Sequence, residues 1–352
     1  MKVYLSTFEN DPHDSPNPFV YTLIDGICKE HDDVSFESNK KVFWTENIFD
    51  FDLIHIMWPD SFVYNETHTV DDFELQLQKI KKSKPIIVCT CHNLCSHNSK
   101  SQSVAAYDIA YKYTDVFIHL GKYSLKILKD KYPSAKHVII PHHVYDTIYK
   151  TKYSKDEGLK KLSLPNKLYA ISLGAFRNSN EKELFFKIAD CLRKYHVYCI
   201  APSFMDIPKG KINKRWIKQR LKRLYWTIKH PNVVLGGGYV SDELLPYYYA
   251  VSDISVIQRI SILNSGNVPL GMFFGNVILG PNVGNINELL QETGNITFNV
   301  NDYSSLNESC KRLYETLNVG QGMKNKEYVL NTMTTQKIAD DTYNLYKSLL
   351  KP

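Results

Sequence analysis

The sequence has 352 residues and a formal net charge of +6, with 43% hydrophobic and 23% charged residues. This length exceeds one ordinary compact domain and accommodates two. The composition is that of a globular protein, which excludes disordered and collagen-like architectures, and so small a net charge does not by itself indicate nucleic-acid binding.

The cysteines and the apolar runs indicate the compartment. Seven cysteines are an odd number in a long chain, which argues against a disulfide framework. The apolar run at the N-terminus is too short for a signal peptide, and no window approaches the roughly 18 apolar residues of a spanning helix. We therefore expect a cytoplasmic protein with reduced thiols.

Short apolar segments alternate with helical patterns in the first half of the chain. Strands are expected at 3–6, 53–57, 85–91, 116–120 and 137–140, and helices at 17–29, 103–113 and 124–131. This alternation predicts a parallel, doubly wound sheet.

The pattern breaks over the polar stretch 150–166, where we place a linker. A second alternating series follows. Its strands are expected at 169–173, 197–201, 233–235, 254–257 and 277–280, and its helices at 181–194, 242–251, 269–274, 286–291, 303–317 and 326–349. The expected domains are 1–160 and 161–325, followed by a C-terminal helical segment, 326–352. Ligands of such folds bind beyond the carboxyl ends of the strands.

Five segments at or near the expected strand exits carry glycines, histidines or charged residues. In chain order they read CHNLCSH (91–97), IIPHHVY (139–145), LGAFRNSNEK (173–182), GYVSDELLPYYYAVSD (238–253) and VGNINE (283–288), the last preceded by Gly275. Their order and spacing resemble GT-B glycosyltransferases, most closely the group around glycosyltransferase family 4. The resemblance implies two Rossmann-like domains facing a cleft, with a C-terminal helix that crosses back to the first, acceptor-side domain.

One departure from the family concerns its pair of glutamates. The matching positions are Ile262 and Leu270, and the segment NSGN stands at 264–267. This resembles a branch of polysaccharide-assembling transferases that carries Ser-Gly there. The departure weighs against a retaining mechanism, so we favour inversion, and it leaves the donor sugar open.

The resemblance implies a donor site in the second domain. A leaving diphosphate needs fixed cations or a metal ion, and the planar fork of an arginine fits phosphate oxygens. Each candidate also has a structural alternative. Arg177 could be a solvated residue at the start of a helix, and Ser265-Gly266 a simple N-cap turn. Glu288 could complement a helix dipole. Glu181 is the alternative to Lys182 as the residue that matches the lysine position of the family. The donor-binding candidates are Gly174, Arg177, Lys182, Ser265, Gly266, Asn267 and Glu288.

His92 and His97 are the candidate catalytic residues in the first domain. A histidine after a strand could serve as the general base for the acceptor hydroxyl. Related enzymes instead use the histidine of this turn to bind the donor sugar, and a structural turn residue is the third interpretation. The loop after the first strand supplies rival bases, Asp11, His13 and Asp14.

Cysteines near these histidines do not predict a metal site. Cys89, Cys91 and Cys95 contain no Cys-x2-Cys pair, and Cys89 lies inside an apolar run. We interpret them as small buried residues and expect no metal.

The segment 209–229 is basic, contains no acidic residue and carries apolar residues at helical spacing. A basic amphipathic helix with aromatic residues suits an anionic membrane surface. Packing of the apolar stripe on its own domain and binding to RNA are the alternatives. The membrane-surface candidates are Lys214, Arg215, Trp216, Lys218, Arg220, Lys222, Arg223 and Trp226.

Together these features predict a metal-independent glycosyltransferase of the hexosyltransferase type that needs no cofactor. It would move a sugar from a UDP or GDP donor to a lipid-linked glycan during assembly of a bacterial surface polysaccharide such as capsule or O-antigen. Peripheral contact with the inner face of the cytoplasmic membrane is expected, whereas a nucleic-acid partner is not. The alternatives are a non-catalytic sugar- or nucleotide-binding homologue and a nucleic-acid-binding protein.

Overall fold

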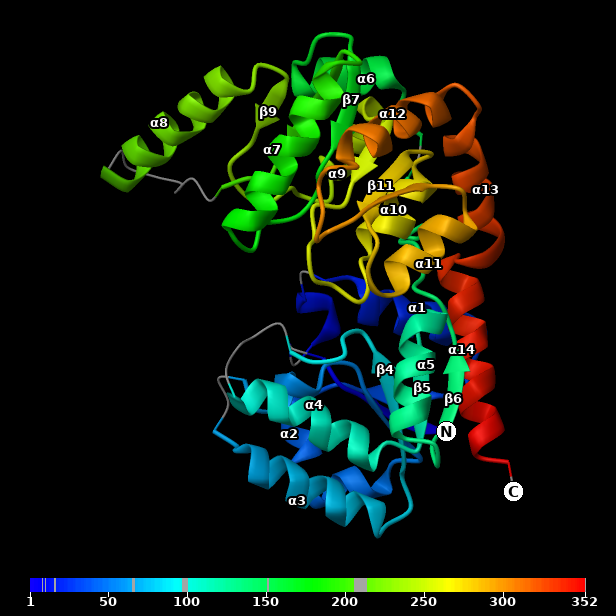
Figure 1. Cartoon of the computed structure of the whole chain (residues 1–352). Coiled ribbons are helices and arrows are strands. Elements are labelled where there is room, and N and C mark those ends of the chain that lie inside the picture. Colours follow the sequence, from blue (N-terminus) through cyan, green and yellow to red (C-terminus); the bar gives the residue numbers. More distant parts are fainter. Residues whose placement is uncertain are drawn as a thin grey trace. The chain divides into compact units, whose positions relative to one another are not determined.

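Two parallel sheets organise the chain, each in its own unit (Figure 1). The structure is a computed structural model that describes residues 1–7, 9, 11–15, 17–64, 67–96, 101–150, 152–205 and 214–351. Unit 1 consists of Met1–Tyr145 and Met333–Pro352, and unit 2 consists of Asp146–Thr332.

Unit 1 has a six-stranded parallel sheet of strand order β2-β1-β3-β4-β5-β6. The strands are β1 (Lys2–Leu5), β2 (Ser35–Glu37), β3 (Leu53–Ile56), β4 (Ile86–Cys91), β5 (Val116–His119) and β6 (Lys136–Ile139). Every residue of β3 and of β5 is buried, as expected for central strands covered by helices on both faces. The helices are α1 (Phe19–Glu30), α2 (Lys40–Phe43), α3 (Val70–Lys81), α4 (Ser101–Tyr113), α5 (Lys122–Lys131) and α14 (Thr335–Leu349).

The C-terminal helix α14 returns to unit 1 and packs on α1. Gly26 makes this approach close, since a Cβ atom there would lie 2.9 Å from that of Ala339. The Tyr346 hydroxyl lies 2.5 Å from Nδ1 of His55 in β3. The predicted return of a C-terminal helix to the first domain is confirmed.

The predicted single helix at 326–349 is two helices in the structure, α13 (Gln321–Thr332) in unit 2 and α14 in unit 1. The break occurs at Met333 and Thr334, where the chain passes from one unit to the other. The Thr334 side chain accepts a hydrogen bond from the Lys337 N–H and so begins α14.

Unit 2 has a second six-stranded parallel sheet, of order β12-β11-β10-β7-β8-β9. The strands are β7 (Leu168–Ile171), β8 (Val197–Ala201), β9 (Val233–Leu235), β10 (Ile254–Val256), β11 (Val277–Pro281) and β12 (Ile296–Phe298). Besides α13, the helices are α6 (Lys155–Leu162), α7 (Ser179–Arg193), α8 (Lys214–Lys229), α9 (Leu245–Val251), α10 (Asn267–Phe273), α11 (Gly284–Glu292) and α12 (Leu306–Leu317). The predicted pair of doubly wound, Rossmann-like domains is confirmed.

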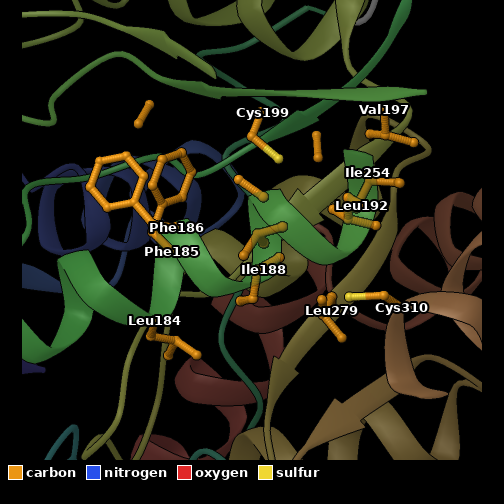
Figure 2. Packing of buried hydrophobic residues seen from close by; sticks show 14 of the residues in the cluster. Leu184, Phe185, Phe186, Ile188, Leu192, Val197, Cys199, Ile254, Leu279 and Cys310 are labelled. Carbon is orange, nitrogen blue, oxygen red and sulfur yellow. The ribbon is translucent and has the colours of Figure 1, made fainter. Parts of the chain in front are cut away.

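The core of unit 2 forms where α7 lies on the sheet. Figure 2 shows the apolar side chains of α7 gathered beside those of the strands. They follow the spacing of one helical face, which explains why this segment buries as a helix. The labelled residues are Leu184, Phe185, Phe186, Ile188 and Leu192 of α7, with Val197, Cys199, Ile254, Leu279 and Cys310.

The expected linker at 150–166 contains helix α6, which belongs to unit 2. Ser154 and Glu157 form a capping box that begins the helix within this polar stretch. A Cβ atom at Gly158 would lie 2.6 Å from Cγ1 of Val251, so α6 packs closely on α9. The boundary between the two units therefore follows Tyr145, whereas the sequence predicts a domain boundary after residue 160.

Candidate functional site

The candidate donor site lies at the carboxyl ends of β7 and β10. These two strands are neighbours, yet β7 is followed along the chain by β8 on its other side. The strand order therefore reverses between β7 and β10, and open α/β sheets bind ligands in the crevice at such a point.

The turn after β7 is tied to the loop after β10. Gly174 has φ +92°, and a Cβ atom there would lie 3.4 Å from both Arg259 Nη2 and Asn267 Nδ2. Asn267 Nδ2 donates to the Leu173 carbonyl at 2.9 Å. The structure thus brings two predicted donor-binding residues, Gly174 and Asn267, together with an arginine that the sequence analysis did not select.

A buried ion pair fixes this turn. Arg259 Nη1 lies 2.6 Å from Glu181 Oε2, and the two side chains are 12% and 3% exposed. Arg259 also donates to the Ala175 carbonyl at 2.9 Å, and Glu181 accepts the Arg177 backbone N–H at 2.8 Å. Glu181, the alternative to Lys182, therefore holds the backbone of the turn.

Arg177 is exposed at the start of α7, and its electrostatics depend on two neighbours. Partial burial lowers the pKa of Arg177, the positive charge of Arg259 lowers it further and the carboxylate of Glu181 raises it. The charges of Arg177, Arg259 and Glu181 thus influence one another around this turn, which carries two positive charges and one negative charge. The excess positive charge would favour an anion.

Lys182 points elsewhere in unit 2. Its Nζ lies 5.2 Å from the ring centroid of Phe204, beyond the end of β8. Burial and then the charge of Lys222 lower the pKa of Lys182. These contacts place Lys182 away from the Glu181–Arg259 pair, whereas Arg259 contacts the turn itself.

The loop after β10 is also clamped to the start of α11. Gly284 has φ +58°, and a Cβ atom there would lie 2.7 Å from the carbonyl oxygens of Ile262 and Leu263. Asn285 Nδ2 donates to Asn264 Oδ1 at 2.8 Å. This clamp places half-buried Ser265 and Gly266 just before α10, and half-buried Glu288 in α11 one turn after Gly284.

The two positions that match the family's glutamates have structural roles. The carbonyl oxygen of Ile262 lies where a Cβ atom at Gly284 would stand, and Leu270 is buried inside α10. Neither position offers a carboxylate to a ligand.

In unit 1, His92 follows β4 in an aromatic environment. Its ring stacks on Trp58 with centroids 4.7 Å apart and meets the edge of Phe19 at 4.6 Å. His142 and His143 contact the same phenylalanine. Burial, followed by the nearby His142 and His55, holds the pKa of His92 well below its usual value. A neutral histidine with so low a pKa is a weak base, which weighs against general-base catalysis and agrees with both the sugar-binding and the structural interpretation.

The other candidates of unit 1 are distributed differently. His97 lies outside the described residues. The Asp11 carboxylate accepts the backbone N–H of His13 at 2.9 Å, and the His13 ring lies 3.6 Å from the carboxylate of Asp25. Asp14 is the last residue of a short 3-10 helix, Pro12–Asp14. The hydrogen bond of Asp11 and the ion pair of His13 thus lie within the loop or reach Asp25 of α1, and neither of them involves His92.

The basic segment forms α8 from Lys214 onward, whereas 209–213 lies outside the described residues. Three membrane-surface candidates need correction, because Trp216, Arg223 and Trp226 are half-buried on the side of α8 that is attached to unit 2. Trp226 stacks on Phe186 with centroids 4.4 Å apart and packs against the core of unit 2. This tryptophan attaches α8 to the domain, so it cannot belong to the exposed surface of the helix.

Comparisons with known proteins identify the fold. No protein-family model matches the chain, and no curated protein matches its sequence. Anabaena Alr3699/HepE in complex with UDP-glucose has a TM-score of 0.72 at 12% identity, covering 99% of this chain and 100% of that one. The sucrose-phosphate synthase of Thermosynechococcus elongatus has a TM-score of 0.71 at 13% identity, with 99% and 98% covered.

The chain has the GT-B fold. An α,α-trehalose-phosphate synthase (UDP-forming) from Burkholderia vietnamiensis shares it with a TM-score of 0.64 at 11% identity, covering 99% of this chain and 98% of that one. In the part of the chain that the structure describes, none of the helices has the length and apolar character needed to cross a membrane.

Proposed function

We propose that this GT-B protein is a glycosyltransferase that uses a nucleotide-diphosphate sugar, of the UDP type. The observation that carries the proposal is the arrangement of Arg177 and Arg259 around the turn after β7, at the switch point of unit 2. Structures of the same fold support the donor class, since one holds UDP-glucose and another is named UDP-forming.

In the proposed reaction, an acceptor hydroxyl oxygen attacks the anomeric carbon and forms the new glycosidic bond. The bond between that carbon and the β-phosphate oxygen breaks, and its electron pair leaves with the nucleoside diphosphate. Negative charge grows on this leaving group, and the positive charge of the Arg177 guanidinium would stabilise it in the transition state. The hydroxyl proton passes to a base.

His92 is proposed to orient a sugar hydroxyl rather than to take the proton. Its ring is held between Trp58 and Phe19, and burial keeps it neutral near pH 7. A neutral imidazole both donates and accepts hydrogen bonds, as recognition of a sugar requires. The proposed acceptor is a lipid-linked glycan of a bacterial surface polysaccharide, as the sequence resemblance implies.

The first experiment measures binding of UDP, GDP, CMP, dTDP and ADP by calorimetry and thermal shift. We expect UDP to raise the melting temperature, because a ligand that binds only the folded state stabilises it. Arg177→Ala should weaken UDP binding by about 1.5–3 kcal/mol, or roughly 10- to 150-fold in Kd, through loss of charge-assisted hydrogen bonds.

Arg193→Ala is the matched control. Arg193 is also exposed but lies at the opposite end of α7, so this variant should bind UDP like the wild type. If none of the diphosphates stabilises the wild type, or if Arg177→Ala binds UDP unchanged, the proposed donor site is wrong.

A non-catalytic binding protein is the second candidate, favoured by the absence of both family glutamates at 262 and 270. It would bind UDP through the same arginines but would not release UDP from a UDP-sugar in the presence of acceptor glycans. Measurement of UDP release therefore separates the two functions once binding is established.

A further inference from the structure

Helix α8 exposes an apolar face to solvent. Its side chains Ile217, Leu221, Leu224 and Ile228 are 46%, 61%, 56% and 73% exposed. They stand at positions i, i+4, i+7 and i+11, so at 3.6 residues per turn they form one continuous stripe. We call these four residues the outer face of α8. The possibility that this stripe packs on its own domain is excluded by these exposures.

The helix is attached to unit 2 by the opposite side. The half-buried residues of α8 are Trp216, Gln219, Arg223 and Trp226, again at one helical spacing. Trp226 lies nine residues after Ile217, which at about 100° per residue places it roughly opposite the outer face. Its ring stacks on Phe186, and this contact fixes which side of the helix faces solvent.

Basic residues flank the outer face. Residues 214–229 include seven Lys and Arg and no Asp or Glu. On a helical projection Lys214 and Lys218 lie along one margin of the stripe, and Arg220 lies along the other. Figure 1 shows α8 beside β9, the edge strand of the unit 2 sheet.

We propose that the outer face of α8 is a docking surface for an anionic lipid bilayer. A helix of 16 residues is about 24 Å long and lies in the plane of the interface. The four apolar side chains enter the boundary between headgroups and acyl chains, and the flanking lysines remain among the lipid phosphates. The inference is independent of the proposed function, since vesicle binding requires no nucleotide.

The combination of charge and exposed apolar area selects this partner. A second copy of the chain would bring another strongly basic helix against the first, and the like charges would repel. A nucleic acid would use the basic residues but would leave the apolar outer face in water. An anionic membrane surface offers both a negative potential and an apolar layer beneath it.

The test is flotation of the full chain with vesicles of phosphatidylcholine alone or containing 30% phosphatidylglycerol. We expect binding to the anionic vesicles only. Lys214→Glu/Lys218→Glu should lower the partition coefficient about tenfold or more, since each basic residue near such a surface contributes about fivefold. Leu221→Ser/Ile228→Ser, which leaves the charge unchanged, should lower it roughly tenfold or more.

Two control variants match these changes on unit 1. Lys122→Glu/Lys126→Glu makes the same charge change with the same spacing on α5, and Leu75→Ser removes a 53% exposed leucine of α3. Both should bind vesicles like the wild type. Circular dichroism and melting temperatures of all variants establish that the chain remains folded.

Several outcomes would overturn the proposal. One is equal binding to neutral and anionic vesicles, or none to either. Another is binding that survives Leu221→Ser/Ile228→Ser, or that the α5 control lowers equally. A third is that the chain binds a single-stranded RNA but no vesicles, and that Lys214→Glu/Lys218→Glu abolishes the RNA binding. A dimer that Leu221→Ser/Ile228→Ser dissociates would show that the outer face binds a second copy.

Discussion

Glu181 and Arg259 act as a pair at the residue scale. The carboxylate is nearly inaccessible to water, and the guanidinium also holds the Ala175 carbonyl. Replacement of one partner leaves the other charge buried without compensation, which typically costs about 3–5 kcal/mol. We therefore expect Arg259→Met to lower the free energy of unfolding by about that amount, as measured by urea titration.

Glu181→Gln/Arg259→Met supplies the control for this prediction. Because both charges are then absent, the double variant should be more stable than Arg259→Met alone. Equal stabilities of the two variants would contradict a coupled pair. UDP binding by the double variant should remain weaker than that of the wild type, since the positive charge of Arg259 and its hydrogen bond to the Ala175 carbonyl are both absent.

At the scale of elements, the start of α11 decides the shape of the donor loop. Gly284 adopts φ +58° against the carbonyls of Ile262 and Leu263. Gly284→Ala adds both backbone strain and a clash, so we expect it to lower the free energy of unfolding by about 3 kcal/mol or more and to abolish UDP binding. Chemical denaturation and calorimetry measure the two effects.

Gly320→Ala is the matched comparison. Gly320 also has a positive φ, +73°, but an added Cβ would meet no atom within 4 Å. In Gly320→Ala, backbone strain alone should lower the free energy of unfolding by about 1 kcal/mol or slightly more. UDP binding should remain unchanged. A similar effect of both substitutions would argue that the contact with the β10 loop is unimportant.

At the scale of the whole molecule, neutral buried histidines make unit 1 sensitive to acid. Burial lowers the pKa of His55 to about 3 and that of His142 to about 4, and burial and His137 lower that of His119 to about 3. The unfolded chain binds protons near pH 6.5, whereas folded unit 1 does not. Stability is therefore present above pH 6.5 and is lost as pH falls toward 4, by up to about 1.4 kcal/mol per pH unit for each histidine.

Tryptophan fluorescence can follow this loss in unit 1 alone. The four tryptophans are Trp44, Trp58, Trp216 and Trp226. The variant Trp216→Phe/Trp226→Phe retains only those of unit 1 and keeps an aromatic ring on Phe186. Its urea midpoint should fall steeply between pH 7.5 and 5. A midpoint that does not change over this range would refute the prediction.

The architecture follows from local pattern. Apolar runs such as 53–57 and 85–91 predict buried strands, and their alternation with helices predicts parallel sheets, because strand and helix periods depend only on neighbouring residues. The same reasoning located the turn after β7, whereas Arg177 was selected through the family resemblance and its donor-binding role stays a prediction. The apolar and basic stripes of α8 also depend on local spacing.

Contacts between distant segments could not be read in this way. Arg259 lies 78 residues from Glu181, and only the adjacency of β7 and β10 brings them together. A charged residue in the loop shortly after a buried strand was the available signal. Likewise, the capping box at Ser154 is local, but the assignment of α6 to unit 2 depends on its packing against α9.

The sequence by itself determined two doubly wound domains, a C-terminal helix and an amphipathic basic helix, because each follows from the spacing of apolar residues along the chain. Only the tertiary structure decided which charges meet at the switch point, which side of α8 faces solvent and how far burial shifts the pKa of His92. These properties depend on strand order and on the exclusion of water by distant parts of the chain, and a local pattern contains neither.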